Sequence, residues 1–242
     1  METPAGVKRG PTMRDGGKGR DFGGELLSTS IKRLLLERIM SGHYQPGERI
    51  IELQVAKELG TSQSPIREAL RDLAGVGIVT ITSRRGARVR MPTGKDLADV
   101  SVVRAQIDAL AAELAAPRMT DKLLGELQDA YEEMCRHLDY GDHAAMTEAD
   151  ARFHRIIATT SDNQAVERVF DQLEPFARTF LTLTLPNLDV RPLIDEHKGI
   201  LDALRHGDAQ TASLRARLHQ LDVSALFRDH FPPQADADGG AA

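Results

Sequence analysis

The sequence predicts a mainly α-helical protein that combines an N-terminal winged helix-turn-helix domain with a C-terminal antiparallel six-helix bundle. Apolar residues recur at helical spacing through most of the chain. The exception lies at residues 77–91, where two short β-patterned runs flank the basic turn SRRG. The charge also divides the chain, because residues 1–93 carry 16 basic and 10 acidic side chains, a net charge of +6, whereas the remainder carries −11. A basic module therefore precedes an acidic helical one, and only the first is suited to a polyanion.

The two ends of the chain are glycine-rich or polar and lie outside the predicted domains. We expect disordered tails at 1–24 and 232–242, the winged helix-turn-helix domain at 25–92 and the helical domain at 93–231. The first tail lacks the apolar core of a secretory signal, and no apolar run approaches the ~20 residues of a membrane span. The single cysteine, Cys135, excludes a disulfide framework and fits a reducing compartment. The sequence therefore predicts a cytoplasmic protein.

Three helices are predicted before the hairpin. The first covers about residues 27–42 and the second about residues 51–59. The third, SPIREALRDLAG at 64–75, has Ser64 as its predicted N-cap and Pro65 at the first helical position. The face of this third helix that we expect to be buried carries Ile66, Ala69, Leu70 and Leu73.

Arginines on the third helix and in the hairpin favour recognition of double-stranded DNA. A short helix with a polar start, one apolar side and the exposed arginines Arg67 and Arg71 is what a major groove accepts. The hairpin arginines are suited to phosphates or to a minor groove. A charged helix face alone is more often simply solvated, so the adjacent hairpin is what strengthens the prediction. The candidate DNA-contacting residues are Ser62, Gln63, Ser64, Arg67, Arg71, Arg84, Arg85, Gly86 and Arg88.

The second half of the chain is predicted to be helical throughout. Breakers such as Pro117, Gly141, Pro186 and Gly207 separate the helices, and the short links favour antiparallel packing. The sequence contains no glycine-rich nucleotide loop, no GxSxG nucleophile motif and no HExxH motif. The predicted helices cover about residues 95–116, 119–139, 142–160, 163–184, 190–206 and 209–230.

Two pairs of residues in this half are spaced to form a metal site. Asp150 and His154 are four residues apart on one helix and therefore face the same way. His197 and His219 are equidistant from residue 208, inside the turn between the last two helices, so antiparallel packing places them level with each other. Together they offer one carboxylate and three imidazoles, a ligand set for a divalent metal. The alternative is that the histidines are surface residues or hydrogen-bonded core residues.

These segments resemble a known family. The stretch 45–89, with PGERI, LGTSQSPIREALRDLAGVGIV and RRGARV, is similar to the GntR superfamily of bacterial transcription regulators. The second half resembles the ligand-binding FCD domain of the FadR-like subfamily. The matching pieces are VRAQIDALAAELAA at 103–116, DARFHRIIATTSDN at 150–163, EHKGILDALRHGD at 196–208 and His219. Six helices rather than seven resemble the shorter, VanR-type branch.

The resemblance implies a dimeric repressor or activator with a metal in its bundle. The implied ligands are Asp150, His154, His197 and His219, and zinc, nickel and manganese are not distinguished by them. A small carboxylate effector is implied on or near that metal. Arg104, on the first bundle helix, is our candidate for the effector's second charged contact, and a surface salt bridge is the alternative role for it.

Two positions depart from the usual pattern of the family. Gln63 stands where arginine is usual at the start of the recognition helix. Glutamine pairs with adenine, whereas arginine prefers guanine, so the base preference at that position is expected to differ. Asp108 stands where glutamate is common in the first bundle helix, which shortens the side chain by a methylene group.

The sequence therefore predicts a metabolite-responsive transcription regulator that binds a pseudo-palindromic operator as a homodimer. Three alternatives stay open. A zinc ion on such a ligand set can activate water, so a metal-dependent hydrolase is one of them, although no general base is apparent. The second is a dimerisation bundle with a purely structural metal. The third is a constitutive DNA-binding protein with an empty pocket.

Overall fold

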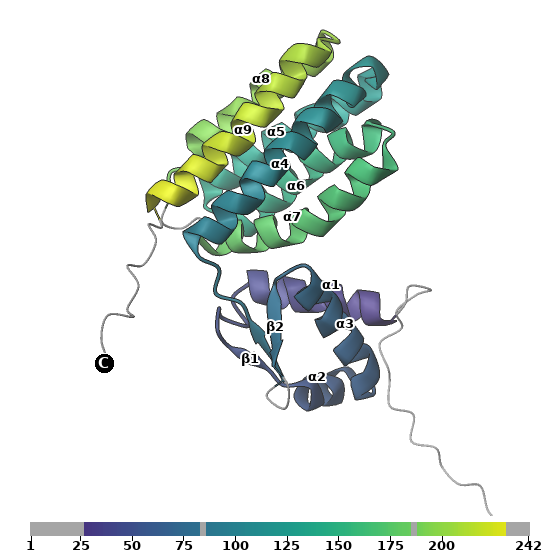
Figure 1. Cartoon of the computed structure of the whole chain (residues 1–242), viewed down its shortest axis with the longest axis vertical. Helices are drawn as coiled ribbons and strands as arrows, with labels where there is room; N and C mark the ends of the chain where they lie inside the picture. The colour runs from purple at the N-terminus through teal and green to yellow at the C-terminus, as the bar shows by residue number, and fades with distance from the viewer. Residues whose placement is uncertain (1–26, 83–85, 185–187, 231–242) are drawn as a thin grey trace, which may run out of the picture.

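The protein folds as a small mixed domain followed by a larger bundle of helices, as the sequence predicts (Figure 1). The computed structural model describes residues 27–82, 86–184 and 188–230, so both predicted tails lie outside the described residues. In Figure 1 the N-terminal domain lies below the bundle. No helix in the described ranges is long and apolar enough to cross a membrane.

The N-terminal domain has the predicted order of helices and hairpin. Its third helix packs against the first two, and three short strands form an antiparallel sheet in the order β1-β3-β2. Strand β1 pairs Arg49 with Arg88 and Ile50 with Ala87. The sequence did not predict it, because two residues are too few for a periodic pattern. The elements are α1 (Leu27–Met40), β1 (Arg49–Ile50), α2 (Glu52–Leu59), α3 (Gln63–Gly75), β2 (Val79–Thr82) and β3 (Gly86–Val89).

Helix α3 begins earlier than the sequence predicts. Ser62, rather than Ser64, is its N-cap, and no side-chain cap hydrogen bond is formed there. Pro65 consequently lies at the third helical position instead of the first. A proline is tolerated at this place because the N–H groups of the first turn have no partner within the helix. The predicted apolar face is buried, and it comprises Ile66, Ala69, Leu70 and Leu73.

The described part of the bundle follows the predicted breakers, and Pro186 lies outside the described residues. Pro117 lies in a 3-10 turn, and Gly141 and Gly207 leave their helices with φ angles of 71° and 66°. Such positive angles favour glycine, because it has no Cβ atom to clash. Helices α4 and α9 pack extensively against each other. The helices are α4 (Gly94–Ala115), α5 (Asp121–Tyr140), α6 (His143–Thr160), α7 (Gln164–Thr184), α8 (Arg191–Arg205) and α9 (Ala209–His230).

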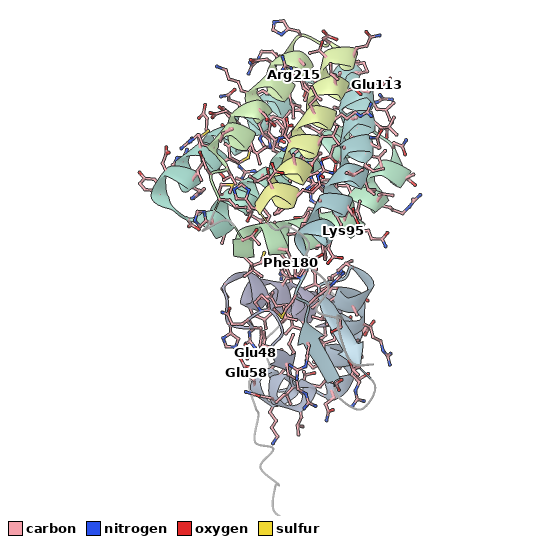
Figure 2. All side chains as sticks on the ribbon, turned by 60° about the vertical axis from the view of Figure 1, so that its left-hand side comes forward. Glu48, Glu58, Lys95, Glu113, Phe180 and Arg215 are labelled. Carbon is pink, nitrogen blue, oxygen red and sulfur yellow. The ribbon has the colours of Figure 1, made fainter. Side chains whose placement is uncertain are left out.

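The two domains share part of a hydrophobic core. Phe176 and Phe180 of α7 and Phe227 of α9 pack with the buried apolar residues of the N-terminal domain. Figure 2 shows Phe180 where the two domains meet. The guanidinium of Arg90 lies 5.6 Å from the centre of the Phe176 ring and donates a 2.7 Å hydrogen bond to Asp96 Oδ1. Helix α7 therefore contacts the N-terminal domain directly, and Phe227 of α9 belongs to the same apolar cluster.

Helix α4 begins beside this junction with a capping box. Thr93 Oγ1 accepts a 3.1 Å hydrogen bond from the backbone N–H of Asp96, and Asp96 Oδ2 accepts a 2.8 Å hydrogen bond from the N–H of Thr93. The two side chains thus satisfy backbone donors that the first helical turn leaves without partners. The capping box fixes the residue at which the chain enters the bundle.

Replacing Thr93 with alanine is expected to lower the free energy of unfolding by about 1 kcal/mol, because the Asp96 N–H loses its acceptor. Urea denaturation followed by circular dichroism measures the difference. Thr159→Ala is the matched control, since Thr159 is exposed inside α6 and alanine is the better helix former there. The control should be neutral or slightly stabilising, and an equal loss in both variants would contradict the capping role.

Candidate metal centre

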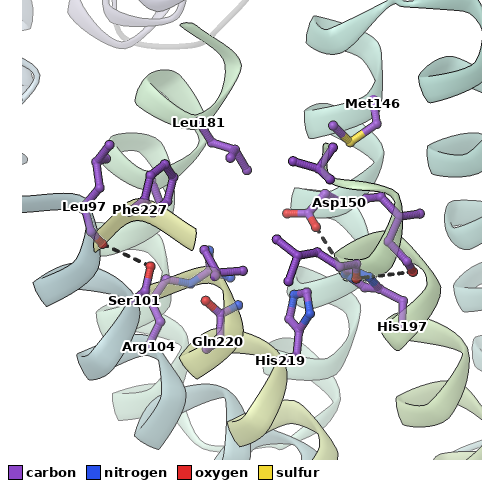
Figure 3. A pocket seen from close by; sticks show the side chains of 15 residues that line it. Leu97, Ser101, Arg104, Met146, Asp150, Leu181, His197, His219, Gln220 and Phe227 are labelled. Atoms are coloured by element: carbon purple, nitrogen blue, oxygen red, sulfur yellow. Dashed lines mark hydrogen bonds and ion pairs between the residues drawn. The ribbon is translucent and has the colours of Figure 1, made fainter. Parts of the chain in front are cut away.

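Four side chains from three bundle helices converge on one point. Asp150 and His154 extend from α6, His197 from α8 and His219 from α9, and one potential ligand atom of each lies within 4.8 Å of the others. His197 Nε2 is 3.1 Å from Asp150 Oδ1 and 3.2 Å from His154 Nε2. Figure 3 shows Asp150, His197 and His219 along one side of a cavity. The spacing argument predicted this convergence, whereas the role of these residues as metal ligands stays a prediction.

The local fold explains why these residues meet. Asp150 and His154 lie one turn apart on α6, so both reach the same side of the helix. The tight turn at Gly207 sends α9 back along α8, which places His197 and His219 level with each other. Their ring centroids are 4.3 Å apart, and the His154 ring stacks on that of His219 at 5.4 Å.

Each imidazole has an acceptor at its outer nitrogen. His197 Nδ1 is 3.1 Å from the carbonyl oxygens of Leu193 and Ile194. His219 Nδ1 is 3.0 Å from Glu196 Oε2, and His154 Nδ1 is 3.4 Å from a carboxylate oxygen of Asp108. Carbonyl and carboxylate oxygens only accept hydrogen bonds, so they favour the tautomers with the proton on Nδ1. Such outer acceptors orient the histidine ligands of metal sites.

With Nδ1 protonated, the inner nitrogens present lone pairs to each other. The 3.2 Å between the Nε2 atoms of His154 and His197 is then a repulsive contact, unless a cation lies between them. Two nitrogens bound to one metal at about 2.1 Å are separated by roughly 3.0–3.4 Å in octahedral or tetrahedral coordination. The observed separation falls in this range. The ligand chemistry and spacing therefore fit a divalent metal.

The site is electrostatically suited to a cation. Burial lowers the pKa of His154 to about 3, and burial also holds the pKa of His219 well below its usual value. Burial alone would raise the pKa of Asp150, but the neighbouring histidines and the Arg104 guanidinium hold that pKa well below the usual value. The imidazoles of His154 and His219 are therefore neutral and the Asp150 carboxylate is ionised at neutral pH, which are the protonation states that bind metals.

The sequence did not assign a role to three further residues of the site. Glu196 orients His219, and the only signal for it was its place beside His197 in the EH pair. Asp108 lies next to His154 and accepts hydrogen bonds from Arg104 at 3.1 Å and from Gln220 at 2.9 Å. The contacts of Asp108 with His154 and Gln220 cross between helices, as does that of Glu196 with His219, so periodicity along one helix does not reveal them.

A cavity of about 40 Å³ lies between the histidine cluster and α4. Figure 3 shows Arg104 and Ser101 on the side opposite Asp150 and His197. Arg104 is only 8% exposed, so its ion pair with Asp108 is buried and not the surface salt bridge of the alternative interpretation. Its Nε atom is buried without a hydrogen-bond partner in the described part of the chain. A buried donor of this kind is available to a bound anion.

On the N-terminal domain, the candidate DNA-contacting residues of α3 are at the surface. Ser62, Ser64, Arg67 and Arg71 are exposed, and Gln63 is half-buried. Arg67 donates from Nη2 to Gln63 Oε1 at 3.0 Å and from Nε to Glu52 Oε2 at 2.6 Å. These hydrogen bonds hold the Arg67 guanidinium against α2 and the start of α3.

The hairpin is described only in part. Arg84 and Arg85 lie outside the described residues. Gly86, predicted to be the tip, is the first residue of β3, has a φ angle of 79° and pairs with Thr82. Arg88 is exposed on β3 and donates a 2.6 Å hydrogen bond to the carbonyl oxygen of Gly47.

Both domains match known families. Residues 27–89 match the gntR family of bacterial regulatory proteins, and residues 99–222, half of the chain, match the FCD domain. The chain belongs to the GntR family, with an FCD domain after its DNA-binding domain. The matched families and the named relatives are transcriptional regulators and not enzymes. The hydrolase alternative is therefore set aside.

Relatives of this GntR-family regulator carry names of operon repressors. A probable D-xylose utilization operon transcriptional repressor of Paenarthrobacter nicotinovorans is 28% identical over 214 residues, which cover 88% of this chain and 91% of the relative. The gluconate operon transcriptional repressor of Bacillus subtilis (strain 168) is 28% identical over 189 residues, covering 76% of each. Among solved structures, E. coli McbR/YncC is similar with a TM-score of 0.73 at 22% identity, covering 85% of this chain and 99% of that chain. That similarity supports the fold.

Proposed function

We propose that this GntR-family regulator binds a pseudo-palindromic operator as a homodimer and responds to a small carboxylate that binds beside a divalent metal in its bundle. It acts in the cytoplasm, where bacterial operators lie. The observation that carries the proposal is one cavity with the inward-facing Asp150, His197 and His219 on one side and the buried cation Arg104 on the other. A carboxylate can bridge these two positive groups once a metal is present.

Asp150, His154, His197 and His219 would hold the metal, with zinc, nickel or manganese as the candidates. When bound, the metal supplies a positive centre with open positions for a carboxylate, provided that it is six-coordinate. Arg104 would bind and orient that carboxylate through its unpartnered Nε–H. Asp108 would keep Arg104 in place through the 3.1 Å ion pair.

The start of α3 would enter a major groove, with Ser62, Gln63, Ser64 and Arg67 near base edges or phosphates and Arg71 farther along the helix. A two-fold dimer would place two such helices about one DNA turn, ~34 Å, apart. The wing, with Arg84, Arg85, Gly86 and Arg88, would lie over the DNA backbone. The hydrogen bond between Arg67 and Gln63 sets the orientation of both side chains before DNA arrives, which lowers the entropy cost of binding.

The cavity offers a route from the effector to DNA. Leu97, Leu181 and Phe227 line the cavity, and the same residues pack in or against the core that the bundle shares with the N-terminal domain. A ligand that fills the cavity would therefore contact side chains of the core that the bundle shares with the DNA-binding domain. It shifts DNA binding only if it binds one arrangement of the domains better than another.

Elemental analysis and thermal unfolding test the proposal. Protein purified without chelator, or titrated with Zn²⁺, Ni²⁺ or Mn²⁺, should hold close to one metal ion per chain. Small carboxylates should then raise the melting temperature only when metal is present, because ligands stabilise the state that they bind. Failure to bind any metal would overturn the proposal, and metal binding without a carboxylate response would favour a purely structural metal.

For the wing, Arg88→Ala is expected to weaken binding to specific and non-specific DNA by the same factor. It should also reduce the slope of the logarithm of the binding constant against the logarithm of the salt concentration by about one. The reason is that a phosphate contact carries no sequence information. Fluorescence anisotropy over a range of salt concentrations measures both quantities. A changed sequence preference with an unchanged salt slope would contradict a backbone contact.

A further inference from the structure

The part of the cavity away from the histidines is lined almost entirely by apolar side chains. Leu97 comes from α4, Ala177 and Leu181 from α7, and Val223 and Phe227 from α9. Figure 3 shows Leu97, Leu181 and Phe227 grouped above Ser101 and Arg104. If the carboxylate of an effector lies between Arg104 and the metal, the rest of the effector therefore points toward these apolar side chains.

The uncharged polar groups in this region already form hydrogen bonds. The Ser101 hydroxyl donates to the carbonyl oxygen of Leu97 at 3.0 Å. The Gln220 amide nitrogen donates to Asp108 at 2.9 Å. Arg104 uses Nη2 for the same carboxylate, and its buried Nε–H has no partner in the described residues, so this donor is available to a ligand anion. The cavity can thus satisfy one charged group but offers little for a row of hydroxyl groups.

We infer that the effector of this protein is a small monocarboxylate with an apolar tail, and not a polyhydroxylated sugar acid. The inference rests on the proposed function of the same cavity. Each methylene that the tail buries should tighten binding about fourfold. Each hydroxyl buried without a partner should weaken it about fivefold or more. The volume of about 40 Å³ favours a short tail, because pockets for larger ligands have several times this volume.

Calorimetric titration of the Zn²⁺-loaded full chain with two matched pairs of acids tests the inference. Butyrate and threonate share a four-carbon chain, and hexanoate and gluconate share a six-carbon chain, so within each pair only the hydroxyl groups differ. We expect the apolar acid to bind at least about tenfold tighter within each pair. Tighter binding of threonate or gluconate would overturn the inference and leave the proposed function standing. If metal binds but none of the acids does, both the effector function and the inference fail.

Two variants test where the apolar tail of the effector lies in the cavity. Ala177→Leu adds bulk to the apolar wall and should weaken butyrate binding about tenfold or more, while the metal content stays that of the wild type. Ala144→Leu is the matched control, since Ala144 is exposed on α6 and outside the cavity. Unchanged butyrate affinity in a metal-loaded Ala177→Leu protein would show that the tail does not lie against α7.

Discussion

His197→Ala is expected to weaken metal binding by more than about 100-fold, a larger effect than loss of an outer-shell partner usually has. His197 is fully buried, and its Nε2 lies within 3.2 Å of both Asp150 and His154. Metal at about 100 times its dissociation constant stabilises the folded state by about 2.7 kcal/mol, and the variant should lose this stabilisation. Competition with a coloured chelator measures the affinity, and thermal unfolding with and without metal measures the stabilisation.

Two controls separate a ligand from a packing residue. His43→Ala removes an exposed histidine of the N-terminal domain, so this variant should bind metal like the wild type. Glu196→Gln keeps the volume but weakens the acceptor of His219 Nδ1, so a roughly 10–100-fold loss of metal affinity is expected. Wild-type metal affinity in His197→Ala would show that the cluster is a hydrogen-bonded core and nothing more.

Arg67→Ala is expected to weaken operator binding by about 1–3 kcal/mol, roughly 5–150-fold, because an arginine at the start of a recognition helix contacts base edges or phosphates. The domain should stay folded, because exposed ion pairs such as that with Glu52 contribute little to stability. Operators selected from random DNA and fluorescence anisotropy at fixed salt provide the measurement.

Arg205→Ala is the matched control for Arg67. Arg205 also pairs with an acidic neighbour, Asp202, at 2.8 Å on a helix surface, but it belongs to the bundle. Its loss should leave operator affinity unchanged. If Arg67→Ala also binds the operator like the wild type, Arg67 is only a solvated side chain that neutralises Glu52.

Much of the fold was predictable from local signals. Glycine and proline interrupt the helical periodicity, so the ends of the bundle helices fall within a few residues of the predicted ones. The meeting of His197 and His219 was predicted from the position of the turn at 206–208, given that the two helices pack antiparallel and that both side chains face inward. The start of α3 was misplaced because a serine before a proline favours an N-cap, yet the first helical turn accommodates Pro65 as well.

The contacts that complete the site depend on how helices pack, which a single sequence does not encode locally. Glu196 reaches His219 from the neighbouring helix, and Asp108 links Arg104 to Gln220 across α4 and α9. The pairing of Arg67 with Glu52 across α2 and α3 is of the same kind. Periodicity identifies which face of a helix is buried, but not which polar side chains meet there.

The shared core gives the two domains a physical connection. Phe176 and Phe180 extend from the bundle into the apolar cluster of the N-terminal domain, and Arg90 lies over the Phe176 ring. Because Phe227 belongs both to this core and to the cavity wall, filling of the cavity and the position of the DNA-binding domain are linked through packing.

Operator affinity in the four combinations of metal and carboxylate tests the central claim most directly. The affinity for a selected operator would be measured by anisotropy with metal-free protein and Zn²⁺-loaded protein, each with and without the acid that binds tightest in the calorimetric titration. The account predicts that this acid changes the affinity only for the metal-loaded protein, and that Arg104→Ala abolishes this change while metal content is retained. An operator affinity that is the same in all four conditions, or an effect of the acid that persists without metal, would contradict it.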